Sequence, residues 1–199
     1  MKKELSLQKV IIQHERWLRG DGGQRADLSK QDLSGVDLSG INLTRANLFR
    51  ANLHTARLYK TRLVRAHLCE ANLSGANLTY ANLSEANLAR AKLFDVDLSG
   101  ADLTRANLSE ADLTDAILTD IRIDNDLFKT FYFPEHRAIL IGDHIAIGCK
   151  TYSIQYWLDN YKIIGERYYY TRKQIEKYGE FIQECAKLKK DTKNEKRNE

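Results

Sequence analysis

Residue types that build disulfide frames, metal sites and membrane spans are scarce in this chain. Its 199 residues include three cysteines and a single proline. Cys69, Cys149 and Cys185 lie far apart, without a CxxC motif or a matching histidine spacing, which argues against a zinc site and a disulfide framework. No apolar run approaches the roughly 20 residues of a membrane-spanning helix. We therefore expect no metal, no disulfide and no membrane segment.

Motifs that carry catalysis are missing as well. The sequence has no glycine-rich phosphate loop, nucleophile elbow, HExxH motif or paired-carboxylate context. The first residues, beginning Met1-Lys2-Lys3, lack the apolar core of a secretory signal. We expect a protein that is not an enzyme, uses no cofactor and works in the reducing cytoplasm.

Neither sign of charge dominates. The formal net charge is +4, and residues 26–125 carry eleven basic and thirteen acidic side chains. No block of five or six like charges marks a nucleic-acid-binding tail. Nucleic acid is therefore not among the partners that the composition favours.

One short repeat, by contrast, fills half of the chain. From Leu28 to Leu118 every fifth residue is leucine, nineteen in succession, and Ile123 takes the next place. Most of these leucines have alanine two residues earlier, Asn or Asp directly before and Ser or Thr directly after. A short, strict period indicates a unit that must stack on its neighbours to bury its apolar side.

This pattern, Ala-(Asp/Asn)-Leu-X-X, resembles that of the pentapeptide repeat family over residues 26–125, in twenty copies without an insertion. The resemblance implies a mainly β fold: a right-handed quadrilateral β-helix with four pentapeptides per coil, in which the leucine and the alanine position point inward. Twenty copies then make about five coils, or a rod about 24 Å long at the usual strand spacing. The leucines expected in its structural core include Leu28, Leu48, Leu58, Leu68, Leu78, Leu88 and Leu108.

The segments that flank the repeats predict caps and a second domain. Residues 1–25 predict an N-terminal capping helix over 5–19, begun by Ser6 and ended by Gly20, and a linker. Trp17 and Leu18 are expected to cover the first coil, because an open solenoid end exposes core and backbone. The alternative is that this helix binds a partner.

Residues 126–190 predict a small α+β C-terminal domain, and residues 191–199 a disordered tail. The aromatic run 128–133 is a candidate cap for the last coil. Residues 138–147 predict a β-hairpin with a two-residue turn. Ser153 and the capping box Thr171–Gln174 each precede a predicted helix.

Departures from the repeat are the candidate functional residues. Six cations and no acid occur between residues 45 and 65, and they form a possible site for an acidic partner, a phosphate-rich ligand or nucleic acid: Arg45, Arg50, Arg57, Lys60, Arg62 and Arg65. The competing interpretation is tolerated surface variation. Alternating signs in Arg50, Glu70, Arg90 and Glu110, spaced by twenty residues, predict a ladder of exposed ion pairs.

Other departures predict structural adjustments. Gln31 and Thr61 replace the small inward residue and need either a hydrogen-bond partner there or a local bulge of the coil. Tyr59, Tyr80, Phe49 and Phe94 are candidates for exposed aromatic side chains, and His67 with Cys69 lacks a third metal ligand.

Together these features predict a non-catalytic protein-binding scaffold. Residues 147–158 also resemble the tail of pentapeptide proteins from phage and prophage genomes, which implies an accessory protein that binds a host factor. The alternative is a DNA-mimicking inhibitor or protector of a topoisomerase (gyrase), an activity of some family members, although the mixed charge departs from such a mimic. A monomer and a homodimer both remain open.

Overall fold

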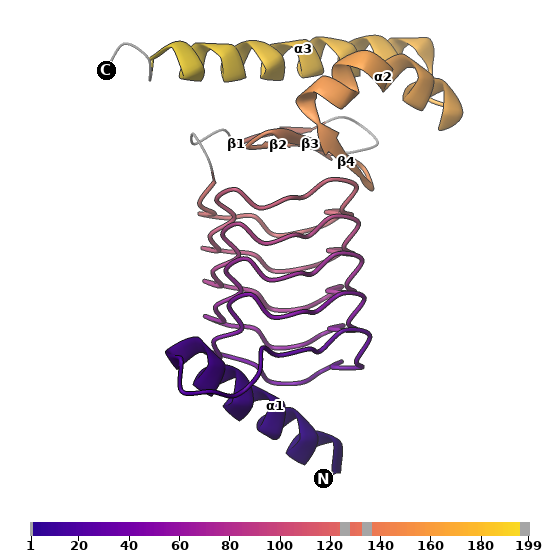
Figure 1. Cartoon of the computed structure of the whole chain (residues 1–199). Helices are drawn as coiled ribbons and strands as arrows, with labels where there is room; N and C mark the ends of the chain where they lie inside the picture. Colours follow the sequence, from indigo (N-terminus) through magenta and orange to yellow (C-terminus); the bar gives the residue numbers. More distant parts are fainter. Residues whose placement is uncertain (1, 124–127, 133–136, 196–199) are drawn as a thin grey trace. The chain divides into compact units, whose positions relative to one another are not determined.

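The structure is a computed structural model that describes residues 2–123, 128–132 and 137–195, with side chains for 6–123 and 138–190 (Figure 1). The chain forms two compact units, Met1–Arg122 and Ile123–Glu199. The first holds α1 (Lys2–Arg19) and the repeats, and the second holds a sheet and two helices.

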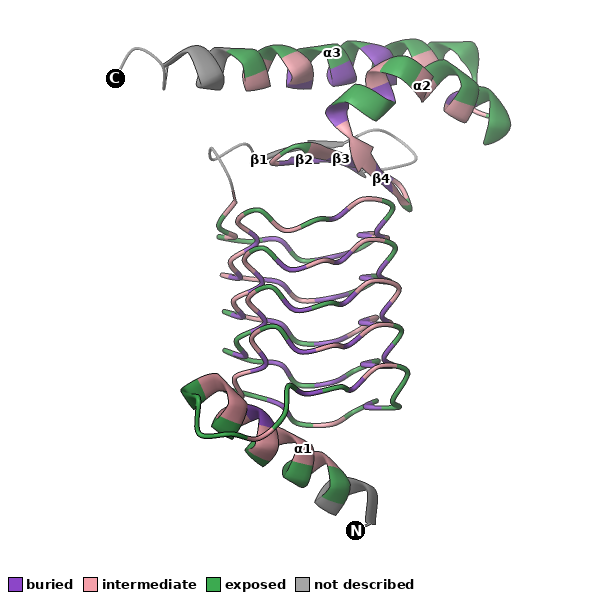
Figure 2. Ribbon diagram, viewed as in Figure 1, coloured by how far each residue is buried: buried purple, intermediate pink, exposed green. Residues whose placement is uncertain are grey.

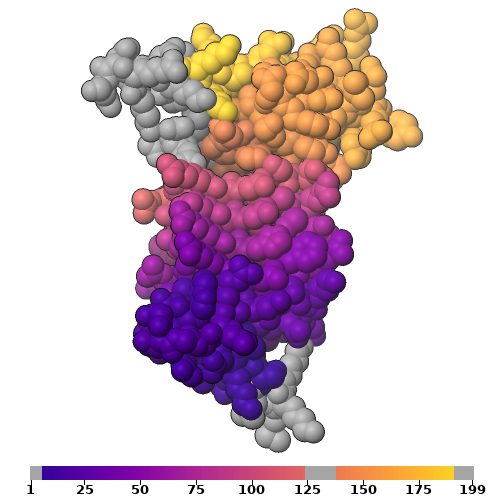
Figure 3. Space-filling view, viewed as in Figure 1, coloured from indigo at the N-terminus to yellow at the C-terminus, as the bar shows by residue number. Residues whose placement is uncertain are grey.

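The repeats wind into a coil that returns to the same place every twenty residues. Parallel bridges join residues twenty apart, from Asp27 with Asn47 to Asp102 with Arg122. The Leu28 N–H donates to the Asn47 carbonyl at 2.7 Å, and Leu48, Leu68 and Leu88 repeat this bond in the coils that follow. Twenty residues are four pentapeptides, so each coil has four sides and four corners. Figure 3 shows the successive coils stacked as one continuous surface.

The leucines fill the interior of this coil. The seven core leucines named above are at most 3% exposed, and most of the alanines beside them are equally buried (Figure 2). Burial of one leucine contributes about 1.5–3 kcal/mol, so the stack is held by many similar contributions.

Each corner is a β-turn whose third residue has a positive φ. The Gln31 N–H, for example, donates to the Leu28 carbonyl at 3.2 Å, and Lys30 between them has φ 58°. The Asp27 side chain accepts the Ser29 N–H at 3.0 Å, which fixes the first half of the turn. Asp and Asn thus hold the corners by hydrogen bonds, and the left-handed residue is the one two places after leucine. Most corners carry a non-glycine residue there, which is uncommon in proteins.

The two polar residues at inward positions behave differently. Thr61 is fully buried, and its hydroxyl donates to the Leu38 carbonyl at 2.8 Å, so the predicted hydrogen bond is confirmed. Gln31 is exposed, and the prediction of a buried side chain is wrong there. Gln31 belongs to the first coil, which has no coil beneath it and is only partly covered by α1.

Helix α1 is longer than the sequence predicted. It begins at Lys2, so Ser6 lies inside it and does not cap it, and it ends before Gly20, which has φ 78°. Trp17 and Leu18 are half-buried, whereas His14 is fully buried. The Ala26 N–H donates to His14 Nδ1 at 3.0 Å, and the His14 ring stacks on Trp17 with centroids 5.5 Å apart. His14 therefore connects α1 to the first repeat.

Burial of His14 makes the docking of α1 sensitive to acid. Desolvation lowers the pKa of His14 from 6.5, and a smaller effect of the Thr44 carbonyl opposes it. Below about pH 6.5 a detached His14 takes up a proton that the docked one does not, so docking weakens as the pH falls. We expect amide hydrogen exchange of α1, corrected for its intrinsic pH dependence, to rise between about pH 7 and pH 5.

The control for this pH effect is His14→Gln, which keeps a polar side chain without a titrating ring. Its α1 exchange should not vary with pH over the same range. An equal acid-induced rise in both proteins would contradict the assignment to His14.

The second unit is a four-stranded antiparallel sheet with two helices. The strands β1 (Phe128–Tyr132), β2 (Arg137–Ile141), β3 (His144–Ile147) and β4 (Lys150–Ser153) follow one another in the sheet. The turn Gly142-Asp143 joins β2 to β3, with Ile141 paired to His144, which confirms the predicted hairpin. The aromatic run thus supplies β1, and residue 133 lies outside the described residues. Its role as a cap for the last coil stays a prediction.

Both predicted helix starts are confirmed. Ser153 Oγ accepts the Tyr156 N–H at 3.1 Å at the start of α2 (Ile154–Arg167). Thr171 and Gln174 exchange hydrogen bonds at the start of α3 (Arg172–Glu195). Residues 191–195 are helical, so the prediction of a disordered tail is wrong for them, and 196–199 lie outside the described residues. None of the described helices combines the length and hydropathy of a membrane span.

One side of the α2–α3 pair closes a small core against the sheet. Trp157 and Ile182 are nearly fully buried there with Leu140 and Ile145. The Trp157 Nε1–H donates to the Ile145 carbonyl at 2.7 Å, so the indole has a polar partner as well as an apolar environment.

Candidate docking surfaces

The six cations predicted as a site lie on different parts of the coil. Arg50 and Lys60 stand at two different corners of the coil. Arg57 lies on the side that ends at the corner of Lys60. Arg45 and Arg65 lie twenty residues apart at one corner, and Arg62 lies on the side that leads to it. Lys60 stands at the opposite corner of that side. The structure therefore groups Arg45, Arg62 and Arg65 along one side and its end corner, and it places the other three at different corners and sides.

Several of these cations are already engaged. Arg50 Nε lies 2.7 Å from Glu70, and Arg90 Nε lies 3.0 Å from Glu110, which confirms the predicted ladder of ion pairs. Arg57 lies 3.0 Å from Asp37. Hydrogen bonds from Ser39, and then from Arg57, lower the pKa of Asp37 to about 2.

The side that carries Arg45 and Arg62 keeps an excess of positive charge. We call it the arginine side, and it consists of Arg45, Arg62, Arg65, Arg105 and Arg122 with Glu85 and Asp102. Glu85 accepts two hydrogen bonds from Arg65, at 2.8 and 3.1 Å, which with the charges of Arg105 and Arg45 lower the pKa of Glu85. Arg122 lies 3.7 Å from Asp102. Neither Arg45 nor Arg62 forms an ion pair with a residue that the structure describes.

A cavity opens where α1 meets the arginine side. It has a volume of about 280 Å³ and is lined by Trp17 and Leu18 of α1 and by Thr44, Arg45, Val64 and Arg65 of the coils. We call it the α1 groove. Sequence reasoning missed it, because the pattern of α1 does not say which corner of the coil the helix reaches.

Exposed aromatic side chains occupy another corner. Tyr59 and Tyr80 are 40% and 61% exposed and meet edge to face, with ring centroids 6.0 Å apart. Lys60 Nζ lies 5.0 Å from the centre of the Tyr59 ring. Phe94 is also exposed, but Phe49 stacks on His67 and is covered by Arg50, so it is not an isolated apolar side chain.

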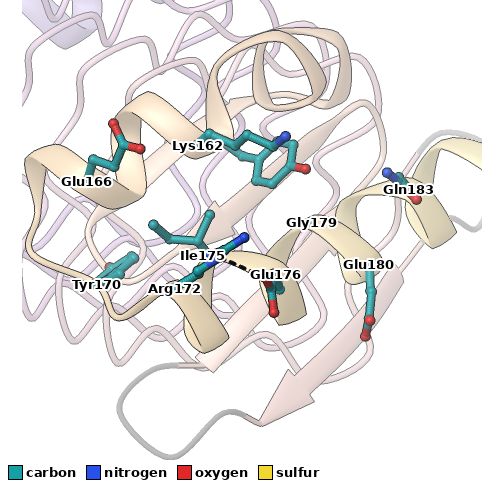
Figure 4. A pocket seen from close by; sticks show the side chains of 10 residues that line it. Lys162, Glu166, Tyr170, Arg172, Ile175, Glu176, Gly179, Glu180 and Gln183 are labelled. Carbon is teal, nitrogen blue, oxygen red and sulfur yellow. Dashed lines mark ion pairs between the residues drawn. The ribbon is translucent and has the colours of Figure 1, made fainter.

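The second unit has a larger cavity, of about 690 Å³, between α2 and α3 (Figure 4). Tyr161, Tyr170 and Ile175 form its apolar part, and Tyr161 lies directly against Gly179, where any Cβ atom would overlap the ring. Two cations and three carboxylates also line it: Lys162, Arg172, Glu166, Glu176 and Glu180. Arg172 pairs with Glu176 at 3.3 Å, so the cavity has no strong excess of either charge.

The comparison with known families agrees with this geometry. The sequence model of pentapeptide repeats matches in eight copies, over residues 24–58, 51–90 and 81–120. The chain belongs to the pentapeptide repeat family. Its members form right-handed β-helices, which is the architecture expected from the sequence. No functionally curated protein matches the chain.

Solved structures of other pentapeptide repeat proteins resemble part of this one. A protein of the Arabidopsis thaliana thylakoid lumen is 33% identical, and the match covers 49% of this chain and 71% of that chain, with a TM-score of 0.40. A protein of the cyanobacterium Nostoc is 31% identical over 51% and 83% of the two chains, with a TM-score of 0.41. QnrB1, a plasmid-mediated fluoroquinolone resistance protein, is 22% identical over 52% and 64%, with a TM-score of 0.37.

The described side chains of this pentapeptide repeat protein offer no metal centre. Residues 6–123 and 138–190 contain no group of three potential ligands, and His67 beside Cys69 stacks on Phe49 instead. Burial, followed by the charge of Glu70, raises the pKa of Cys69, which makes this thiol a poor nucleophile. Asp and Ser side chains beside the leucines, such as Asp27 with Ser29 and Asp97 with Ser99, are occupied in holding the corners.

Proposed function

We propose that this pentapeptide repeat protein is a non-catalytic scaffold that binds another protein on a side of its solenoid. The supporting observation is that the positions of the repeat have different structural roles. Leucine and alanine face inward and the Asp and Asn side chains hold the corners, so only the remaining outward residues are free to vary. An extended surface of this kind is what solenoids use to bind partners.

The arginine side is the part of that surface that we assign to the partner. Arg45 and Arg62 are cations without an ion pair among the described residues, and the coil holds them in fixed positions. Desolvated arginines are frequent hot spots in protein interfaces. A partner with an acidic surface fits this side best.

Two triple variants with equal charge change test the assignment. Arg45/Arg62/Arg65→Glu reverses the arginine side, and Arg50/Arg57/Lys60→Glu reverses three cations elsewhere on the coil. In affinity capture from host lysate followed by mass spectrometry, we expect the first variant to lose the specific partner and the second to keep it. Equal retention by both would remove the arginine side from the proposal, and the absence of any saturable partner would contradict the scaffold itself.

The second candidate function is inhibition or protection of gyrase by imitation of DNA. A DNA mimic needs a strongly negative surface, whereas basic and acidic residues here alternate in ion pairs along the coil. We therefore expect no effect in a gyrase supercoiling assay. Inhibition or protection by sub-micromolar protein would reverse this ranking.

The biological setting that we propose is the cytoplasm, where a phage or prophage accessory protein would bind a host factor. The support is the sequence resemblance of residues 147–158 alone. Expression of the gene with phage late genes would agree with it, and constitutive expression unrelated to a prophage would not. Light scattering coupled to gel filtration decides between a monomer and a homodimer.

A further inference from the structure

We infer that the α1 groove binds an acidic segment of the partner protein, with one apolar side chain in the cavity and a neighbouring carboxylate on Arg45. This inference rests on the proposed scaffold function and assigns a binding site and a ligand chemistry to it. The observation that supports it is that Arg45, which has no ion pair among the described residues, lines a cavity with apolar walls.

The apolar part of the groove has walls from two different parts of the first unit. Trp17 and Leu18 come from α1, and Val64 comes from the corner above Thr44. Stacking against the buried His14 holds the Trp17 ring in place. Val64 is itself a departure from the repeat, which has Ser or Thr at this position in most copies.

The size of the groove favours a side chain over a free ligand. Small-molecule and cofactor sites occupy about 300–1,000 Å³ and enclose most of the ligand. The α1 groove has about 280 Å³ and lies open at a corner of the coil. It therefore fits one or two side chains of a segment that continues across the surface.

The charged residues next to the groove favour a negatively charged segment. Arg65 is held in place by its two hydrogen bonds to Glu85, which also neutralise it. Arg45, directly below Arg65 at the same corner, has φ 62° and an exposed side chain. An arginine and a carboxylate form a charge-assisted hydrogen bond, which adds a charge-specific contact beside the apolar walls.

The same charges favour a peptide over nucleic acid. The affinity of nucleic-acid binding comes largely from many phosphates neutralised by Lys and Arg side chains. On the arginine side Arg65 is neutralised by Glu85 and Arg122 lies beside Asp102, so few of its cations are available for a run of phosphates.

The test uses a displayed library of random dodecapeptides, selected on the immobilised full-length protein. We expect the enriched peptides to combine Asp or Glu with a Leu, Ile or Phe anchor. The best peptide is then resynthesised with a fluorescent label, and its binding is measured by anisotropy against matched pairs of variants. Single-stranded oligonucleotides, labelled in the same way, serve as the nucleic-acid probe.

The first pair of variants tests whether the effect of a charge reversal depends on its position at the groove. Arg45→Glu and Lys30→Glu each reverse one exposed cation at the positive-φ position of a corner, but only Arg45 lines the groove. We expect Arg45→Glu to weaken peptide binding about tenfold or more, and Lys30→Glu to change it less than about twofold. An equal effect of both variants would overturn the site.

The second pair separates the apolar wall from general hydrophobicity. Val64→Ser and Phe94→Ser both restore the residue that is usual after leucine, so both variants keep the fold. Only Val64→Ser should weaken binding. If enriched peptides bind the protein but ignore Arg45 and Val64, the groove assignment fails and the scaffold stands. If no peptide and no lysate protein binds, the proposed function fails too, and tight oligonucleotide binding would replace both.

Discussion

Replacement of Leu58 or Leu78 by aspartate unfolds the solenoid. Both leucines are 0% exposed, and each lies between the leucines twenty residues earlier and later, so an introduced carboxylate has only apolar neighbours. Truncation of a buried leucine to alanine alone costs about 2–5 kcal/mol. Burial of an unpaired charge adds a larger penalty, and small domains have only about 5–15 kcal/mol of stability in total.

The measurement is far-ultraviolet circular dichroism with thermal unfolding. We expect Leu78→Asp to lose the β signal of the coil and its cooperative transition. Asn77→Asp in the same repeat is the control, since Asp is common at that outward position, and its melting curve should match the wild type. A wild-type curve for Leu78→Asp would contradict the inward stack.

The second large effect is expected from Gly23→Ala, which should detach α1 from the first coil. Gly23 has φ 82°, and a Cβ atom there would overlap the carbonyl oxygen of Gln13 and approach the Arg16 Cβ to 2.8 Å. Both contacts are with the backbone or the base of a side chain in α1, so no rotamer change relieves them. The hydrogen bond from the Gln24 N–H to the same Gln13 carbonyl is lost as well.

Gly22→Ala is the matched control, because Gly22 has almost the same φ, 79°, but its Cβ would meet only the flexible end of Arg16 at 3.7 Å. The control should show the conformational penalty alone, about 1 kcal/mol. Limited trypsin digestion at neutral pH is the readout. We expect rapid cleavage at the arginines of α1 in Gly23→Ala only, and similar protection in both variants would contradict the packing of the linker against α1.

The course of the solenoid could be predicted from the sequence because its cause is local and repeated. Each pentapeptide carries its own inward leucine, and Asp or Asn stands where the corner needs a side-chain acceptor. Even for Thr61, which departs from the repeat, the need for a hydrogen bond could be predicted from its inward position. The left-handed residue of each corner was not recognisable, because charged residues such as Lys30 and Arg45 occupy a place where glycine is the usual signal.

The docking surface could be predicted only in part. Six cations in twenty-one residues look like one patch in the sequence, but the four-sided coil sends Arg50 and Arg57 to other sides and leaves Arg45, Arg62 and Arg65 together. The buried role of His14 depends on the N–H of Ala26, twelve residues away. No periodicity within α1 contains that information, and the groove beside α1 was therefore missed.

The twenty-residue return also determines how such a surface can change. Insertion or loss of one pentapeptide keeps the inward leucines in step but turns everything beyond it by a quarter of a circle. Removal of the repeat 81–85, for example, would leave Arg45 and Arg65 in place and carry Arg105 and Arg122 to a neighbouring side. Only a change of four repeats lengthens or shortens the rod without rotation. The number of repeats therefore sets the rotation of the later coils relative to the earlier ones. Two relatives with intact repeats can for this reason present different combinations of the same residues on one side.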